Sequence, residues 1–204
     1  MDLKFIVDVS SVSKAWAEAS WHVAFHSEMS SFTFAPNQAA LVRFMYSGTI
    51  DLIMIDFVGL LVALVKRSQK TGEKWNIEEG SDLSLAKVLD RVGELTANDL
   101  KDLFENDKVR MVRCRQMFGT VLYCPIGWLL LEKTIAEVES GAKVACIGLR
   151  KTYMMDRHVD AYKKMIMLMK NGGADVSRMQ AISECMEKAI EDAEFAEEQK
   201  KGKA

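Results

Sequence analysis

The 204-residue sequence predicts an all-α protein, a two-lobed helical bundle with an N-terminal helical arm. Three observations lead to this prediction. The chain has only two prolines, Pro36 and Pro125, and proline is excluded from helix interiors because it lacks the amide N–H and clashes with the preceding turn. Apolar residues recur at spacings of three and four along most of the chain. Residues typical of helix caps stand at the ends of these segments.

Nine helices follow from these signals. They are expected, in chain order, at residues 13–28, 36–46, 49–68, 81–92, 96–104, 107–117, 126–140, 156–170 and 176–198. In the first, Trp16, Ala19 and Val23 form an apolar stripe, and Pro36 suits the first turn of the second. The third contains the most apolar segment, residues 50–65. Its two aspartates, and a length below the roughly 20 residues of a membrane-spanning helix, favour a buried core helix.

Turn and cap residues define the later helices. Thr96 and Asp99 match a capping box at the start of the fifth helix, and the glycine pair at 172–173 ends the eighth. Residues 119–125 are expected to be extended. The segment 143–149 is either a strand or a buried turn of helix. No internal repeat of fixed period is visible.

The chain divides into an N-terminal arm at 1–33, an N-lobe at 34–105 and a C-lobe at 106–204 that includes the last helix and the tail. The net charge is −2. Basic residues nevertheless exceed acidic ones between residues 100 and 170, while both ends of the chain are acidic. A local excess of this kind matters more than the total charge to a polyanionic partner.

The sequence predicts no catalytic activity, no cofactor and no metal site. His22 and His26 are four residues apart, but no further ligand pattern accompanies them. Nothing places Cys124 beside His158 as a nucleophile and base, and the nucleotide-binding and hydrolase glycine motifs are absent. The four cysteines are scattered without a C-x-x-C pair, which fits a reduced intracellular protein.

Grouped basic residues, with aromatic residues nearby, suit a phosphate backbone whose bases stack alongside. The candidate RNA-binding residues are Lys66, Arg67, Lys70, Lys74, Lys87, Arg91, Arg110, Arg113 and Arg115. A further basic group runs from Arg150 to Lys164 and contains Tyr153 and Tyr162. The alternative for all of them is a solvated helix surface whose charges are offset by neighbouring acids.

One part of the chain resembles a known family. The apolar residues 58–65 lead into Lys66 and Arg67, and a polar loop then leads to the segment SDLSLAKV at 81–88. This order is similar to that in the nucleocapsid proteins of the bunyavirus group of segmented negative-strand RNA viruses. The resemblance implies a single-stranded RNA held in a groove between two helical lobes. Its phosphate contacts would be Lys66, Arg67, Lys70, Lys74 and Lys87.

The same resemblance implies that the N-terminal arm docks on the next protomer through Trp16, Trp21 and Phe25; packing of these residues on their own core is the alternative. The expected partners are single-stranded RNA, further copies of the chain and the viral polymerase, with no membrane span. The expected location is the virion ribonucleoprotein and the host cytoplasm. The alternative function is a helical adaptor that binds protein partners through its apolar N-terminal helix.

Overall fold

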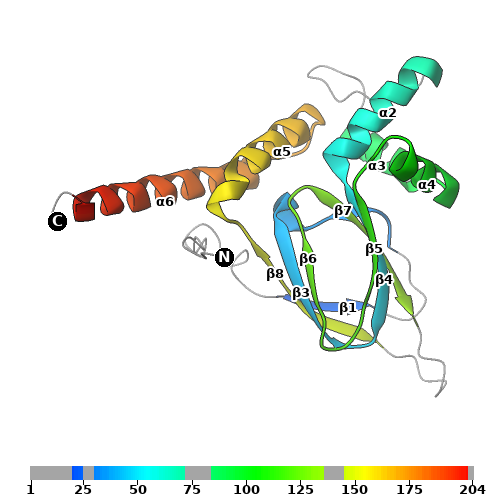
Figure 1. Cartoon of the computed structure of the whole chain (residues 1–204), viewed down its shortest axis with the longest axis horizontal. Helices are drawn as coiled ribbons and strands as arrows, with labels where there is room; N and C mark the ends of the chain where they lie inside the picture. The colour runs from blue at the N-terminus through cyan, green and yellow to red at the C-terminus, as the bar shows by residue number, and fades with distance from the viewer. Residues whose placement is uncertain (1–19, 25–29, 72–83, 136–144, 202–204) are drawn as a thin grey trace.

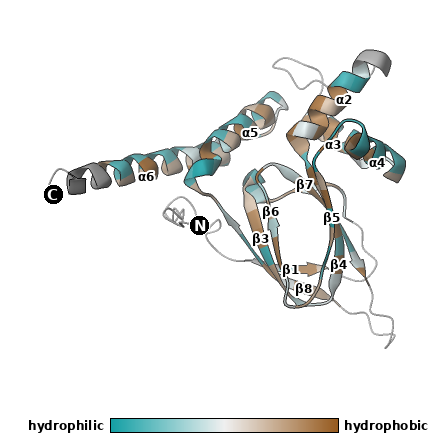
Figure 2. Cartoon of the chain, in the orientation of Figure 1, coloured by the Kyte–Doolittle hydropathy of each residue, from teal (hydrophilic) through white to brown (hydrophobic). Residues whose placement is uncertain are grey.

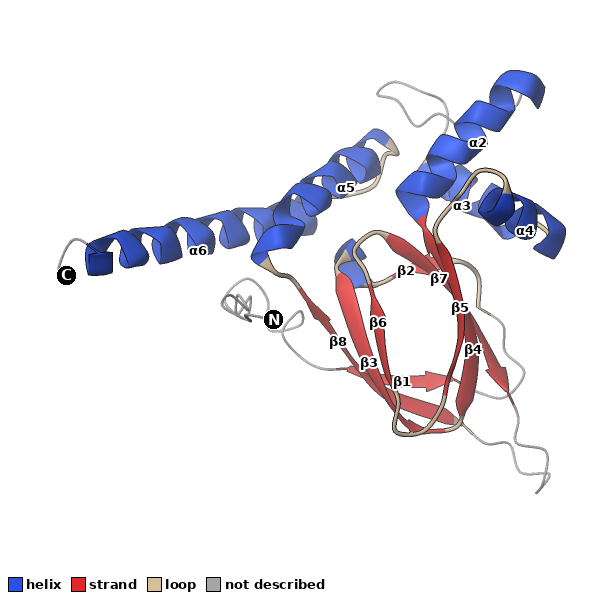
Figure 3. Ribbon diagram, in the orientation of Figure 1, coloured by secondary structure: helices blue, strands red, loops and turns tan. Residues whose placement is uncertain are grey.

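The structure, a computed structural model of the chain, describes residues 20–24, 30–71, 84–135 and 145–201. Two four-stranded antiparallel sheets face each other, and helices extend from one end of them (Figures 1 and 3). The all-α prediction, with its two helical lobes, is therefore wrong. Five of the nine predicted helices contain a strand in the structure.

The first sheet has the strand order β1-β8-β3-β6, and the second has the order β2-β7-β4-β5. The strands of the first sheet are β1 (Ser20–Ala24), β3 (Ala40–Ser47), β6 (Val121–Cys124) and β8 (Cys146–Tyr153). Those of the second are β2 (Thr33–Phe34), β4 (Thr49–Asp56), β5 (Met111–Gln116) and β7 (Trp128–Ile135). Each sheet therefore contains strands from both sides of residue 105, the predicted boundary between the two lobes.

The helices of the described residues are α2 (Phe57–Thr71), α3 (Leu85–Gly93), α4 (Ala97–Glu105), α5 (Val159–Asn171) and α6 (Ser177–Lys201), with short 3₁₀ helices at Pro36–Gln38 and Asp156–His158. The helix predictions at 81–92, 96–104, 156–170 and 176–198 are confirmed, apart from the ends of these segments. The capping box at Thr96 and Asp99 is also confirmed, because each residue's side chain accepts the other's backbone N–H.

The helix predictions at 13–28, 36–46, 49–68, 107–117 and 126–140 are wrong where the described residues form strands, and residues 13–19, 25–28 and 136–140 lie outside the described residues. Apolar residues lie on both faces of several strands, so a high apolar density matches helical spacing by chance. In β3, for example, Leu41, Arg43 and Met45 are buried between the sheets, while the intervening residues are apolar or aromatic and lie on the outer face. The prediction at 49–68 is half correct, because β4 ends at Asp56 and α2 follows directly.

The two halves of the chain share one topology. In each half four strands are followed by helices: β1–β4 by α2 and β5–β8 by α5. Moving every strand four places along the chain, counted cyclically, turns the first sheet's order β1-β8-β3-β6 into β5-β4-β7-β2, which is the second sheet. The halves are thus related by an approximate twofold relation, although the sequence shows no repeat.

The strand registers show which residues of the two halves correspond to each other. Aligning Pro36 with Pro125, which precede β3 and β7, makes Glu132 the counterpart of Arg43. His22 then becomes the counterpart of Gln116. In β8, the residue that pairs with His22 lies two positions from the residue that pairs with Arg43. In β4, the residue that pairs with Gln116 likewise lies two positions from the residue that pairs with Glu132. The four matched side chains meet between the sheets, as described below.

Two apolar cores hold this arrangement. One lies between the sheets and includes Leu41, Ile50, Leu52, Leu122 and Leu130. The other joins the helices to the end of the second sheet and includes Phe57, Leu60, Val88, Tyr162, Met165 and Met179. The hydrophobic colouring of α2 where it leaves β4 marks this junction (Figure 2). None of the described helices has the length and apolar character needed to cross a membrane.

Candidate functional site

The outer face of the first sheet is apolar and aromatic. Phe44 and Tyr46 reach it from β3, Tyr123 from β6 and Tyr153 from β8, since alternate residues of a strand share a face. These four residues are called the aromatic face below. Tyr46 is 46% exposed and Tyr123 is 41% exposed. Contiguous exposed apolar surface of this kind is typical of an interaction site.

The four rings form two pairs. Phe44 and Tyr46 meet edge to face, with their ring centroids 4.8 Å apart and an interplanar angle of 73°. The centroids of Tyr123 and Tyr153 are 5.9 Å apart, and the two side chains are hydrogen-bonded. Burial, and to a lesser extent this hydrogen bond, raise the pKa of Tyr153. The phenol therefore stays neutral at physiological pH.

The first sheet carries no negative charge. Its four strands contain no Asp or Glu, but they do contain Arg43, Arg150 and Lys151. Lys151 is exposed and lies in register with Val42, which pairs on its other side with Tyr123. Lys151 therefore shares this face with the tyrosine pair, two residues from Tyr153 along β8 and two strands from Tyr123. Stacking rings together with an exposed cation suit a partner that has flat aromatic groups and negative charge.

An apolar turn joins the aromatic face to the second sheet. Residues 117–120 link β5 to β6, and Met45 of β3 fixes the turn by a backbone bond to Gly119 and another to Thr120. Gly119 has φ +76°, a conformation that favours glycine. The preceding Phe118 is 73% exposed. β5, this turn and β6 are called the β5–β6 edge below, because each strand is the last in its sheet.

The outer face of the second sheet is basic beyond this edge. Asp51 of β4 pairs across the sheet with Arg115 on one side and Lys133 on the other. The Arg115 guanidinium donates to both carboxylate oxygens of Asp51, at 2.7 and 3.0 Å. Arg115 is the main cause of a lowered pKa of Asp51, and Arg113 and Lys133 add to it. Three cations therefore surround one carboxylate.

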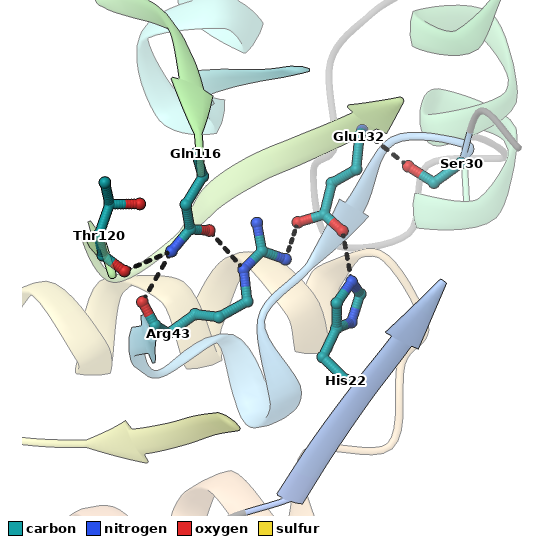
Figure 4. A network of polar contacts seen from close by, with 6 residues as sticks. All are labelled: His22, Ser30, Arg43, Gln116, Thr120 and Glu132. Carbon is teal, nitrogen blue, oxygen red and sulfur yellow. Dashed lines mark hydrogen bonds and ion pairs between the residues drawn. The ribbon is translucent and has the colours of Figure 1, made fainter. Parts of the chain in front are cut away.

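A buried polar network crosses the space between the sheets (Figure 4). Arg43, only 1% exposed, donates from Nε to the side-chain oxygen of Gln116 at 2.7 Å and from Nη1 to Glu132 at 2.5 Å. Gln116 donates in return to the backbone carbonyl of Arg43 at 2.9 Å. Ser30 fixes the Glu132 backbone by accepting its N–H. The network joins both sheets through side chains.

His22 completes the network from β1. Its Nε2 lies 3.4 Å from Oε2 of Glu132, an ion-pair distance without hydrogen-bond alignment. Burial lowers the pKa of His22, and the positive charges of Arg43 and Arg150 add to that effect, while Glu132 opposes it. His22 is therefore neutral in the folded protein at physiological pH.

Acidification is expected to destabilise the protein through His22. Below about pH 6.5, the ordinary histidine pKa, the unfolded chain binds a proton that the folded protein takes up only at lower pH. The free energy of unfolding therefore falls as the pH falls. The change from pH 7.5 to 5.5 in urea unfolding should be smaller in H22Q than in the wild type. The pKa of His158 is lowered as well, so H158Q should remove a further part of this change in the free energy of unfolding. An unaltered pH dependence in H22Q would contradict the prediction.

Three of the predicted RNA-binding arginines lie in ion pairs. Arg67 of α2 binds Asp102 and Asp107. Arg110 binds Asp56, and its guanidinium also lies 5.8 Å from the centroid of the Trp128 ring. Arg115 binds Asp51, as described above.

The other predicted residues that the structure describes are spread over α2, α3, β5 and β1. Lys66 is exposed on α2, Lys87 is exposed and Arg91 half-buried on α3, and Arg113 is exposed on β5. Lys70 lies in α2 and Trp21 in β1. The predictions for Lys74, Trp16 and Phe25 lie outside the described residues. Of the nine predicted RNA-binding positions, the structure brings together Arg113 and Arg115, which share one face of β5.

The aromatic face is not apparent from the sequence. Its members come from three strands that are distant in the sequence. β3 was predicted as a helix, while β6, which lies in the segment 119–125 predicted to be extended, was given no role. One signal was available: Tyr153 lies beside the basic residues Arg150 and Lys151. The alternation V-R-F-M-Y at 42–46, interpreted as a strand, places Phe44 and Tyr46 on one face.

Cys124 and His158, the residues considered as a catalytic nucleophile and base, have separate contacts in the structure. The buried Cys124 thiol contacts the Pro125 carbonyl at 3.6 Å, and burial raises its pKa to about 12. His158 instead accepts the Met155 N–H at Nδ1. In the described ranges no three His, Cys, Asp or Glu side chains gather as a metal site, and His26 lies outside them. Compared with known proteins, the chain matches no family model and no curated protein.

Proposed function

We propose that the protein binds single-stranded RNA across the aromatic face of the first sheet. The observation that supports this most is the presence of two exposed rings, Tyr46 and Tyr123, on a sheet whose strands contain no acidic residue. Bases stack on exposed rings without regard to sequence, and each stacked base contributes about 1–3 kcal/mol. Lys151 supplies charge for a phosphate beside the tyrosine pair.

The proposal keeps the RNA ligand predicted from the sequence and changes the surface that binds it. The groove between two helical lobes is replaced by a sheet face, because the described residues form two antiparallel sheets with helices at one end. Encapsidation of a viral genome, multimers and contact with a viral polymerase stay predictions. The adaptor function depends on an N-terminal helix at 13–28, and the described part of that segment forms β1 instead.

The Y46A and Y123A variants of the full chain test the proposal. Each is expected to weaken binding of a fluorescein-labelled 12-nucleotide oligouridine about tenfold, measured by fluorescence anisotropy at low salt, because each removes one stacking surface. K151E should weaken binding as well, and it should flatten the dependence of affinity on salt.

Matched controls separate binding from folding. F195A removes an exposed ring on α6, 64% exposed and remote from the sheet in sequence and element, and K101E reverses an exposed charge on α4. Both are expected to bind RNA as the wild type does, with unchanged circular dichroism in all variants. No binding by the wild type, or equal affinities for Y46A, Y123A and F195A, would overturn the proposal.

A further inference from the structure

The corresponding outer positions of the two sheets differ in chemistry. On the first sheet, Phe44 of β3 and Leu149 of β8 are in register. Under the twofold relation their counterparts on the second sheet are Lys133 and Asp51, which are also in register. At this pair of positions one sheet therefore presents apolar side chains and the other presents charges. A ligand with apolar flat groups and a charged backbone would be contacted differently by the two faces.

The charged residues on the outer face of the second sheet around Asp51 have a net charge of +2. Arg113, Arg115 and Lys133 surround Asp51, and its carboxylate is already bound by Arg115. Among the described residues, no carboxylate lies within ion-pair distance of Arg113. The exposed cations suit phosphate oxygens, which accept charge-assisted hydrogen bonds from arginine.

The β5–β6 edge connects the two faces with exposed side chains throughout. Arg113 and Arg115 lie on β5, Phe118 on the turn, and Val121 and Tyr123 on β6, and all five are exposed. Neighbouring strands are about 4.8 Å apart, so a chain that crosses β3 and β6 reaches the edge within a few nucleotides. At the edge it meets a ring first and then two guanidinium groups.

We propose that a single-stranded RNA continues from the aromatic face around the β5–β6 edge onto the second sheet, where Arg113 and Lys133 bind its phosphates. This inference rests on the proposed function. It adds a second subsite of different chemistry, with base stacking on one sheet and phosphate binding on the other. Four nucleotides fill the first subsite alone, and a longer strand reaches both.

The test compares two lengths of labelled oligouridine, four and twelve nucleotides, with the full-length protein. The double variant R113E/K133E is expected to weaken binding of the 12-mer at least tenfold and to leave that of the 4-mer within twofold. Because about 0.7 counterion is released per phosphate contact on a single strand, the 12-mer's salt slope should fall by about 1.4. The control K101E/K170E makes the same charge change at exposed helix positions.

The outcomes separate the two proposals. If Y123A weakens both lengths while R113E/K133E and K101E/K170E have equal effects on the 12-mer, the aromatic face binds RNA and the second subsite is wrong. An equal loss for both lengths in R113E/K133E also overturns the second subsite, because the 4-mer would then occupy it. Failure of the wild type to bind either length overturns the proposed function and this inference together.

Discussion

Replacing Arg43 by methionine is expected to lower the free energy of unfolding by about 3–5 kcal/mol, the cost of breaking a buried ion pair by removing one partner. The Arg43 side chain is 1% exposed and bonds to Gln116 and Glu132. Its loss leaves the Glu132 carboxylate and the Gln116 oxygen between the sheets without their donor. Urea unfolding followed by circular dichroism measures the change.

A double variant keeps this prediction testable if R43M does not fold. In R43M/E132L both charges are removed, so the protein is expected to be more stable than R43M, since replacing a buried pair by apolar residues is often neutral or stabilising. R113M removes an exposed arginine on β5 and should change the free energy of unfolding by less than about 0.5 kcal/mol. Equal losses in R43M and R113M would contradict the role assigned to the network.

Replacing Phe57 by alanine is the second change with a large expected effect. Phe57 is the first residue of α2, is fully buried, and meets Phe34 of β2 edge to face with a centroid separation of 4.9 Å. Removing a buried phenylalanine side chain costs about 3–5 kcal/mol, through the lost burial and the cavity that remains. The midpoint of urea unfolding should fall accordingly, with an unchanged slope.

The exposed Phe104 of α4 provides the matched control. It is 53% exposed, so F104A should cost less than 1 kcal/mol, the range of ordinary surface substitutions. Because Phe57 joins the second sheet to the helices, loss of α-helical signal before loss of sheet signal in F57A would show that the junction is the weak point. Equal stabilities of F57A and F104A would contradict the assignment of Phe57 to the core.

The helices with strong local signals could be predicted from the sequence. Thr96 and Asp99 form their capping box within four residues, and Gly172 ends α5 by a backbone bond to Leu168. These signals are local, so they can be recognised without knowledge of distant contacts. The same holds for α6, which the sequence predicts at 176–198 and which spans Ser177–Lys201.

The strands could not be predicted in the same way, because their pattern depends on partners far away in the chain. β3 reads A-L-V-R-F-M-Y-S, and the inward Arg43 is the one charged residue in it. An arginine at a buried position is explained only by Gln116 and Glu132, 73 and 89 residues away. Likewise, the sequence places Asp51 and Asp56 in a buried core helix, but in β4 each is paired with an arginine on a distant segment.

In the candidate site, too, local features are visible in the sequence and long-range contacts are not. Clustered charges are visible in a sequence, but their neutralisation is not: Arg67, Arg110 and Arg115 each lie against an aspartate that the sequence separates by 35 to 64 residues. The aromatic face needed the pairing of β3 with β6 and β8 before its four rings could be recognised as one surface.

The twofold relation between the halves has a consequence for the history of the chain. If one half-length chain had first assembled as a pair of identical copies, positions 43 and 132 would have held the same residue. Two arginines or two glutamates would then have faced each other between the sheets and repelled. The present Arg43–Glu132 pair is available only to a chain whose halves have diverged. Fusion of the copies would therefore have let each half become specific for the other and unable to pair with itself.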